Sequence, residues 1–244
     1  MATHQFKVYK GTPSGDIVEA VTERSALTDD QVLIDVTHSG VCGTDEQYVQ
    51  CGSLSAMKDG DRVGWGYPSS DCGTCDSCIS GFPIYRENDP PKMYGFDGID
   101  SGSFARGTIR SEAFVFPILD RLPSNAAALL MCGGITIWAA LTLHRMVKPN
   151  DMVGVIGIGG LWHLAIQFAK AIGCEVVVFR ASHFVTAKGK PEWNVLRKID
   201  HLLITTSQND DWKLFMPFMA KGGSNFPMAP LDSEATLDIP TWTF

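Results

Sequence analysis

Three cysteines in one short loop are the residues of this 244-residue chain that most directly suggest chemistry. Cys72, Cys75 and Cys78 follow one another at three-residue spacing in a loop that is rich in glycine. This spacing allows three thiolates to converge on one metal ion, and thiolates are ligands that zinc prefers. A closed structural zinc site needs four ligands, so the loop predicts a metal site that is one ligand short.

A second group of residues predicts a nucleotide site. Three glycines follow the short apolar run 153–156 and precede apolar residues at helical spacing that end at Gly173. A strand, a glycine turn and a helix in this order are typical of a loop that holds a dinucleotide pyrophosphate. Trp162 replaces the third glycine of the pattern, so we expect its side chain to push the helix away or to lie out over the loop. The candidate cofactor-binding residues here are Gly157, Gly159, Gly160 and Leu161.

The end of the next apolar run, 175–179, indicates which dinucleotide binds. NAD sites usually offer Asp or Glu at this point, whereas a 2′-phosphate calls for Arg and small polar groups. Here Arg180 and Ser182 follow the run, with no carboxylate among the residues between them. The sequence therefore favours NADP(H) over NAD(H), with the alternative that Arg180 is only a solvated charge at a strand end.

Composition and charge exclude other classes of protein. The chain is 45% hydrophobic and carries a net charge of −7, which argues against a nucleic-acid partner. The N-terminus contains no apolar signal segment, so we expect a cytoplasmic protein with reduced cysteines. The uncharged stretch 126–143 is interrupted by Gly133 and Gly134, and we interpret it as one or two buried helices rather than a membrane span.

The elements that must position these residues form two unlike halves. The first half is β-rich: 31–36 reads as a strand, 58–63 as a turn entering a strand, and 102–105 as the start of an extended segment. The second half alternates strand and helix, with the periodicity of strands at 153–156, 175–179 and 201–206 and of a helix at 161–172.

These patterns predict an α/β protein with a β-rich domain over residues 1–124, including the cysteine-rich lobe 71–87, and a Rossmann-type parallel-sheet domain over residues 125–244. The second domain is too short for the usual six strands, and we expect about four. Its tail carries Pro227, Pro230 and Pro240 and reads as irregular.

Four motifs in fixed order give the chain a family resemblance. They are the segment from Gly40 to Asp45, the cysteine loop, the segment from Met131 to Gly134, and the glycine loop from Gly157 to Leu161. In this order they resemble the zinc-dependent medium-chain alcohol dehydrogenases, and most closely their cinnamyl-alcohol-dehydrogenase-like branch. The resemblance implies a partly barrel-like catalytic domain beside a Rossmann domain, and interconversion of alcohols and aldehydes with NAD(P)(H).

The resemblance also assigns roles to single residues. Cys42 and Cys132 match two ligands of the catalytic zinc ion, Thr44 matches the hydroxyl that relays the substrate proton, and Asp45 matches a residue near the metal. The implied partners are a small alcohol or aldehyde and, in this family, a second subunit of a homodimer. In such sites zinc polarises the carbonyl while nicotinamide gives or takes the hydride.

Both implied zinc sites lack a ligand. The family has a Gly-His-Glu segment before the turn 58–63, but this chain contains no histidine between Cys42 and Cys72. Cys51 is a candidate replacement, and Gln47 stands where a relay histidine is common. In the lobe, the family's fourth cysteine corresponds to Arg86, and the nearest substitute is the carboxylate of Glu87.

Three functional interpretations follow from these matches and gaps. The preferred one is an NADP-linked alcohol or aldehyde oxidoreductase with a weakened zinc site. A second is a zinc-independent enone or quinone reductase, since hydride transfer does not itself need the metal. A third is a catalytically impaired pseudoenzyme or an incomplete gene product, internally deleted and shortened at its C-terminus.

Overall fold

A computed structural model describes residues 3–12, 14–41, 59–66, 68–80, 86, 92–93, 102–143, 147–179, 197–206 and 212–228. The chain divides into two compact units, Met1–Cys132 and Gly133–Phe244. The domain boundary expected at residues 124 and 125 coincides with the beginning of a helix, whereas the division between the units falls inside that helix. Each unit is described by itself below.

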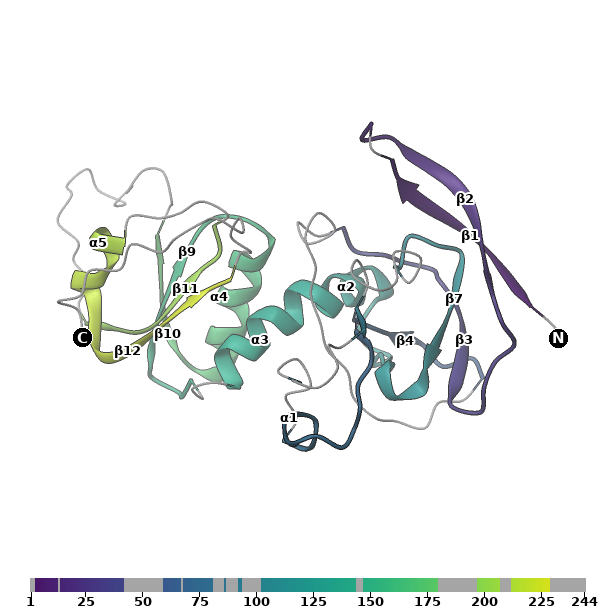
Figure 1. Cartoon of the computed structure of the whole chain (residues 1–244). Helices are drawn as coiled ribbons and strands as arrows, with labels where there is room; N and C mark the ends of the chain where they lie inside the picture. Colours follow the sequence, from purple (N-terminus) through teal and green to yellow (C-terminus); the bar gives the residue numbers. More distant parts are fainter. Residues whose placement is uncertain are drawn as a thin grey trace. The chain divides into compact units, whose positions relative to one another are not determined.

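The first unit is built from pairs of antiparallel strands (Figure 1). The expected strand at 31–36 is present as β3 (Gln31–Asp35), which pairs with β7 (Gly107–Ser111). The expected turn at 58–63 leads into β4 (Val63–Gly64), which pairs with β8 (Phe116–Pro117). The remaining elements of this part are β1 (His4–Gly11), β2 (Ile17–Arg24), β5 (Pro68–Ser70), α1 (Asp76–Ile79), β6 (Lys92–Met93) and η4 (Glu112–Phe114).

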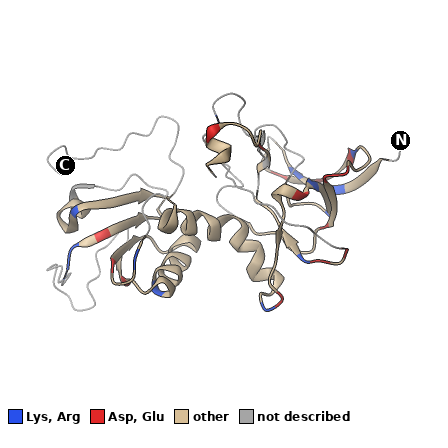
Figure 2. Ribbon diagram, turned by 90° about the horizontal axis from the view of Figure 1, so that it is seen from below, with Lys and Arg blue, Asp and Glu red and all other residues tan. Residues whose placement is uncertain are grey.

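One long apolar helix follows these strands. It comprises α2 (Ser124–Leu129), η5 (Leu130–Gly134) and α3 (Ile135–Thr142), and η5 is a single π-turn. The helix carries no charged residue, as Figure 2 shows. By length and composition it could cross a membrane, with a mean hydropathy of 1.5. Only 28% of its apolar 18-residue stretch is buried. The expectation of a buried helix is therefore met only in part.

The second unit is a four-stranded parallel sheet, as the sequence predicts. Its strand order is β10-β9-β11-β12, and all three neighbouring pairs are parallel (Figure 1). The strands are β9 (Met152–Ile156), β10 (Glu175–Phe179), β11 (Ile199–Ile204) and β12 (Met219–Pro227). Its described helices are α3, introduced above, α4 (Gly160–Ile172), α5 (Trp212–Phe215) and η6 (Met216–Phe218).

The core of this unit explains the fit of α4 on the sheet. All five residues of β9 are buried, which is the pattern of a central parallel strand. On α4 the buried residues are Ala165 and Ala169, whose small side chains let the helix approach the sheet closely. Gly173 ends the helix at φ 98°, as expected for a left-handed C-terminal residue.

One expectation about the tail is wrong. Pro227 was expected in an irregular segment, but it is the last residue of β12, which pairs with β11. A proline can end a strand because it lacks only the N–H that would continue the ladder. Pro230 and Pro240 lie outside the described residues.

Candidate cofactor and metal sites

The glycine loop lies where three parallel strands of the second unit end. Gly157 follows β9, and its N–H donates to the carbonyl of Phe179, the last residue of β10, at 3.1 Å. Its φ of 118° belongs to the left-handed region that favours glycine. In open parallel sheets, ligands bind at the carboxyl ends of the strands. The loop is therefore placed at the functional edge of the sheet.

Thr205 is a residue of this site that sequence reasoning missed. It follows β11, and both its N–H and its hydroxyl donate to the carbonyl of Ile156, at 2.9 and 2.7 Å. A Cβ atom on Gly157 would collide with the Thr205 hydroxyl oxygen. The threonine thus fixes the turn after β9, and the only signal in the sequence is a hydroxyl residue directly after an apolar run.

The beginning of α4 can receive an anion. Gly159 is the N-terminal cap and provides no side chain to bond the first amides, and the first turn contains no acidic residue. Added Cβ atoms on Gly159 and Gly160 would meet nothing within 4 Å, so the space beside the turn is open. Free amides and the positive end of the helix dipole together favour a phosphate group here.

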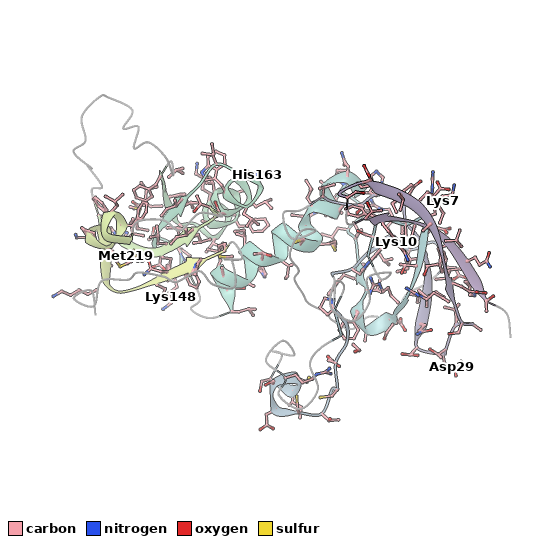
Figure 3. All side chains as sticks on the ribbon, turned by 45° about the horizontal axis from the view of Figure 1, so that its top comes forward. Lys7, Lys10, Asp29, Lys148, His163 and Met219 are labelled. Atoms are coloured by element: carbon pink, nitrogen blue, oxygen red, sulfur yellow. The ribbon has the colours of Figure 1, made fainter. Side chains whose placement is uncertain are left out.

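Trp162 does not lie out over this loop. Its side chain packs against the core cluster of the second unit, and its indole N–H is buried without an acceptor among the described residues. The next residue, His163, is exposed on α4 and labelled in Figure 3. The structure thus accommodates the tryptophan by burying it in part against the core, while Ala165 and Ala169 keep α4 close to the sheet. Arg180 and Ser182, expected to select the cofactor, lie outside the described residues.

The structure brings the three lobe cysteines together. The sulfur atoms of Cys72, Cys75 and Cys78 all lie within 4.8 Å of one another, and those of Cys72 and Cys78 are 3.6 Å apart. Cys75 caps the single turn α1, whose Ile79 N–H donates to the Cys75 carbonyl at 2.9 Å. No residue of α1 is buried, so this turn has no apolar core to hold it. A shared metal ion is the kind of crosslink that stabilises such a turn.

The electrostatics of the lobe favour a thiolate. The Cys72 sulfur accepts the backbone N–H groups of Thr74 and Cys75, and these hydrogen bonds lower the pKa of Cys72 to about 6. Desolvation instead raises the pKa of the Cys78 thiol. Since a thiolate is the form that binds zinc, Cys72 is the residue best prepared to bind first.

A fourth ligand is not found among the described residues of the lobe. Arg86, at the position of the family's fourth cysteine, is buried with 7% of its surface exposed. A guanidinium has no lone pair to offer and remains protonated, so it does not complete a zinc site. Glu87, the expected substitute, lies outside the described residues.

Cys132 lies in the π-turn η5 and is half-buried. A Cβ atom on Gly40 would approach the carbonyl oxygen of Ala128 to 3.0 Å, and one on Gly64 would collide with Met131. Gly40, two residues before Cys42 in the sequence, and Gly64 of β4 therefore both pack on the helix next to Cys132. Thr44, Asp45, Gln47, Cys51 and Cys42 itself lie outside the described residues.

Comparison with known proteins supplies relatives of this chain, although no family model matches it. The chain is 40% identical over 136 residues to cinnamyl alcohol dehydrogenase 8 of Arabidopsis thaliana, an alignment that covers 53% of this chain and 37% of that protein. It is 27% identical over 241 residues to probable cinnamyl alcohol dehydrogenase 1 of Oryza sativa subsp. japonica, covering 81% of this chain and 67% of the relative. It is 30% identical over 211 residues to 1,2-dihydrovomilenine reductase of Rauvolfia serpentina, covering 73% of this chain and 57% of that protein.

Solved structures share the fold. A cinnamyl alcohol dehydrogenase of Sorghum bicolor superposes with a TM-score of 0.79 at 22% identity, over 98% of this chain and 80% of that one. A cinnamyl alcohol dehydrogenase of Helicobacter pylori, complexed with NADP(H), gives a TM-score of 0.75 at 20% identity, over 100% of this chain and 81% of that one. The α/β fold class and the resemblance predicted from the four motifs are confirmed. The alignment with the Arabidopsis relative, however, spans little more than a third of that relative's own length.

Proposed function

We propose that this chain, a relative of the cinnamyl alcohol dehydrogenases within the zinc-dependent medium-chain alcohol dehydrogenases, binds NADP(H) and interconverts an alcohol and an aldehyde. The observation that supports this proposal best is the turn after β9. Gly157 has the positive φ, Thr205 fixes the turn from the neighbouring strand, and the amides of α4 lie directly behind it. This arrangement is what a dinucleotide pyrophosphate needs.

The preference for NADP(H) over NAD(H) is part of this proposal. It relies on Arg180 and Ser182, which directly follow β10 in the sequence. A guanidinium and a hydroxyl suit a 2′-phosphate, whereas NAD sites usually place a carboxylate at this point. The Helicobacter pylori relative is complexed with NADP(H), which agrees with this choice.

Catalysis in this proposal uses Cys42 and Cys132 as the thiolates that hold a zinc ion, with Thr44 passing the substrate proton and Asp45 nearby. When bound, the metal polarises a carbonyl oxygen and the nicotinamide carries the hydride. The packing of Gly40 and Gly64 on the helix that carries Cys132 supports a common position for the two cysteines. Two protein thiolates are one ligand fewer than a catalytic zinc site normally has, so weak metal binding is expected.

A structural zinc ion in the lobe is the second metal in this proposal. The residues present fit it in part, since three thiols already lie within 4.8 Å of one another. Glu87 would close the site with a carboxylate. Substituting Glu87→Gln should lower the affinity for zinc roughly tenfold, measured by competition with a chromophoric chelator. Unchanged affinity would show that Glu87 is not a ligand.

A second candidate function is metal-independent reduction of an enone or quinone. The missing histidine favours it, because hydride transfer to such a substrate needs no metal to polarise an alcohol. One relative, from Rauvolfia serpentina, is itself named a reductase. For both functions we propose a small-molecule substrate and a cytoplasmic location.

One set of measurements on the purified chain tests these functions. Titration with NADPH should enhance or shift the nicotinamide fluorescence, and NADH should bind at least tenfold more weakly. Oxidation of NADPH by cinnamaldehyde that stops after exhaustive chelation would support the zinc-assisted function. Activity on an enone that survives chelation would support the second function instead. Absence of any NADPH binding would contradict both and leave a protein without catalysis.

A further inference from the structure

A cavity in the first unit runs along the edge of a strand. Its volume is about 810 Å³, and it is lined by every residue of β3 from Gln31 to Asp35. Because successive side chains of a strand lie on opposite faces, a cavity that contacts five consecutive residues must follow the strand's edge. The opposite edge of β3 is paired with β7, and no residue of β7 lines the cavity. We call this space the edge cavity.

The backbone of β3 presents hydrogen-bonding groups toward this space. The ladder to β7 uses the even-numbered residues: the Asp30 carbonyl accepts from Glu112 at 2.8 Å, and the Val36 N–H donates to the Arg106 carbonyl at 3.0 Å. In an antiparallel pair the intervening residues direct their N–H and C=O groups to the other side. Leu33, in the middle of β3, therefore offers an N–H and a C=O that bond no other described residue.

A second strand also lines the edge cavity. Residues 59–65 line it without interruption and include β4. The Arg62 carbonyl accepts the N–H of Ile118 at 2.8 Å, and Val63 lies opposite Pro117, which has no N–H. By the same alternation, the N–H and C=O of Val63 lie on the side away from β8. Two of the cavity's walls thus present unpaired strand backbone among the described residues.

The charge of the lining is acidic. Asp35, Asp59 and Asp61 are exposed residues of the wall. The guanidinium of Arg62 adds one positive charge to this lining and bonds neutral groups. It donates to the carbonyls of Leu119, Asp120 and Leu122 and to the Ser124 hydroxyl at distances of 2.9 to 3.1 Å. The apolar part of the lining includes Leu27, Trp65, Ile118 and Met131. A ligand that fits this cavity combines positive charge with apolar side chains.

We propose that the edge cavity binds an extended segment of another protein, with alternating basic and apolar residues, which adds to β3 as a strand. Strand addition satisfies the backbone groups of Leu33, and alternation of side chains suits a wall with both carboxylates and apolar surface. Another protein is a better occupant than a second copy, because each copy carries a net charge of −7 and would bring that charge to an acidic cavity. The cavity borders the helix next to Cys132 through Gly40, Gly64 and Met131, but the inference does not rest on the oxidoreductase activity proposed above.

The test is binding of a fluorescein-labelled peptide with three Lys-Val repeats and blocked ends to the full chain. Fluorescence anisotropy should show saturable binding that weakens as salt is raised. A peptide of Glu-Val repeats should not bind, and neither should the Lys-Val peptide N-methylated at every residue, which lacks the strand donors of both edges. These two controls leave the protein unchanged, so no folding defect can imitate their result.

A matched pair of variants locates the binding site. Asp35→Asn, in the cavity wall, should weaken peptide binding by about two- to fivefold, whereas Glu23→Gln, which removes one charge from exposed β2, should not. Equal binding of the acidic or N-methylated peptide, or equal effects of the two variants, would overturn the proposal. Self-association that the Lys-Val peptide displaces, detected by light scattering, would assign the cavity to a second copy and overturn it as well.

Discussion

Gly157 holds a backbone conformation that other residues adopt only at a cost. Its φ is 118°, and the Thr205 hydroxyl occupies the place that a Cβ atom would need. Gly159, two residues later, has φ −96° and open space where its Cβ would be. The two glycines of one loop therefore differ: the fold requires a glycine at position 157, whereas the described residues leave room for a side chain at position 159.

A pair of alanine substitutions measures this difference. Gly157→Ala should lower the free energy of unfolding by about 1–3 kcal/mol, because it combines an unfavourable φ with a collision. Gly159→Ala should change it by less than about 0.5 kcal/mol. Urea unfolding of the two variants followed by circular dichroism gives both values. Equal stability of the two variants would show that Thr205 does not hold the turn.

The thiol of Cys72 should be the most reactive of the described cysteines in metal-free protein. Its lowered pKa, about 6, means that thiolate forms above pH 6 and outnumbers thiol about tenfold at pH 7. The rate of alkylation by iodoacetamide, followed by mass spectrometry, should be half-maximal near pH 6. Cys174 is the internal control, because burial raises the pKa of its thiol. A Cys72 rate that rises only above pH 8 would contradict the hydrogen bonds assigned to its sulfur.

At the scale of elements, the unit of β9, α4 and β10 is held by small residues on one face of the helix. Ala169 is fully buried in the cluster that includes Val153 and Val155 of β9. Gln167, on the same helix, is exposed. A larger side chain at the buried position must therefore lift α4 from the sheet, together with the amides that face the glycine turn.

Two leucine substitutions on α4 test this packing. Ala169→Leu should destabilise the protein by about 1–3 kcal/mol through overpacking and should weaken NADPH binding, whereas Gln167→Leu should leave both nearly unchanged. Thermal unfolding and fluorescence titration provide the two measurements. Normal cofactor affinity in a destabilised Ala169→Leu protein would indicate that the position of α4 does not control the nucleotide site.

The elements that could be predicted from the sequence are those whose own residues repeat apolar side chains at helix or strand spacing. β9, α4, β10 and β11 carry apolar repeats of strand or helix type and end at glycine or polar residues. β12 was missed because Met219–Pro227 has neither pattern. It forms a strand because it pairs with β11. This pairing is a tertiary contact, and the local sequence carries no pattern that predicts it.

The same distinction holds at the candidate site. The convergence of the three lobe cysteines follows from their spacing, because one turn of chain brings thiols at that interval together. The role of Thr205 and the inward packing of Trp162 depend on neighbours distant in the sequence, and they could not be read from it.

At the scale of the whole molecule, the two compact units depend on different sources of stability. The second unit has two apolar clusters, and residues of β9 and β11 contribute to both. The cysteine lobe of the first unit, by contrast, contains a helical turn with no buried residue. We therefore expect metal binding to stabilise the cysteine lobe of the first unit and to leave the stability of the second unit unchanged.

Removal of zinc should show this asymmetry. In hydrogen-exchange mass spectrometry, a chelator should accelerate exchange of the amides in residues 72–79 and leave those of β9 and β11 unchanged. Cys75→Ser should produce the same local change without a chelator. Protection in the lobe that is insensitive to both treatments would mean that the loop is held by its hydrogen bonds alone.

The π-turn η5 shapes how the length of this helix can change over evolutionary time. A π-turn takes about one residue more than an α-helical turn, so its wider winding absorbs that residue locally. Loss of one residue from η5 would therefore leave an ordinary α-helical turn, whereas the same loss within α2 or α3 would rotate the rest of that helix by about 100°. A lineage can shorten this helix by one residue at η5 with little redirection of side chains, but not elsewhere along it.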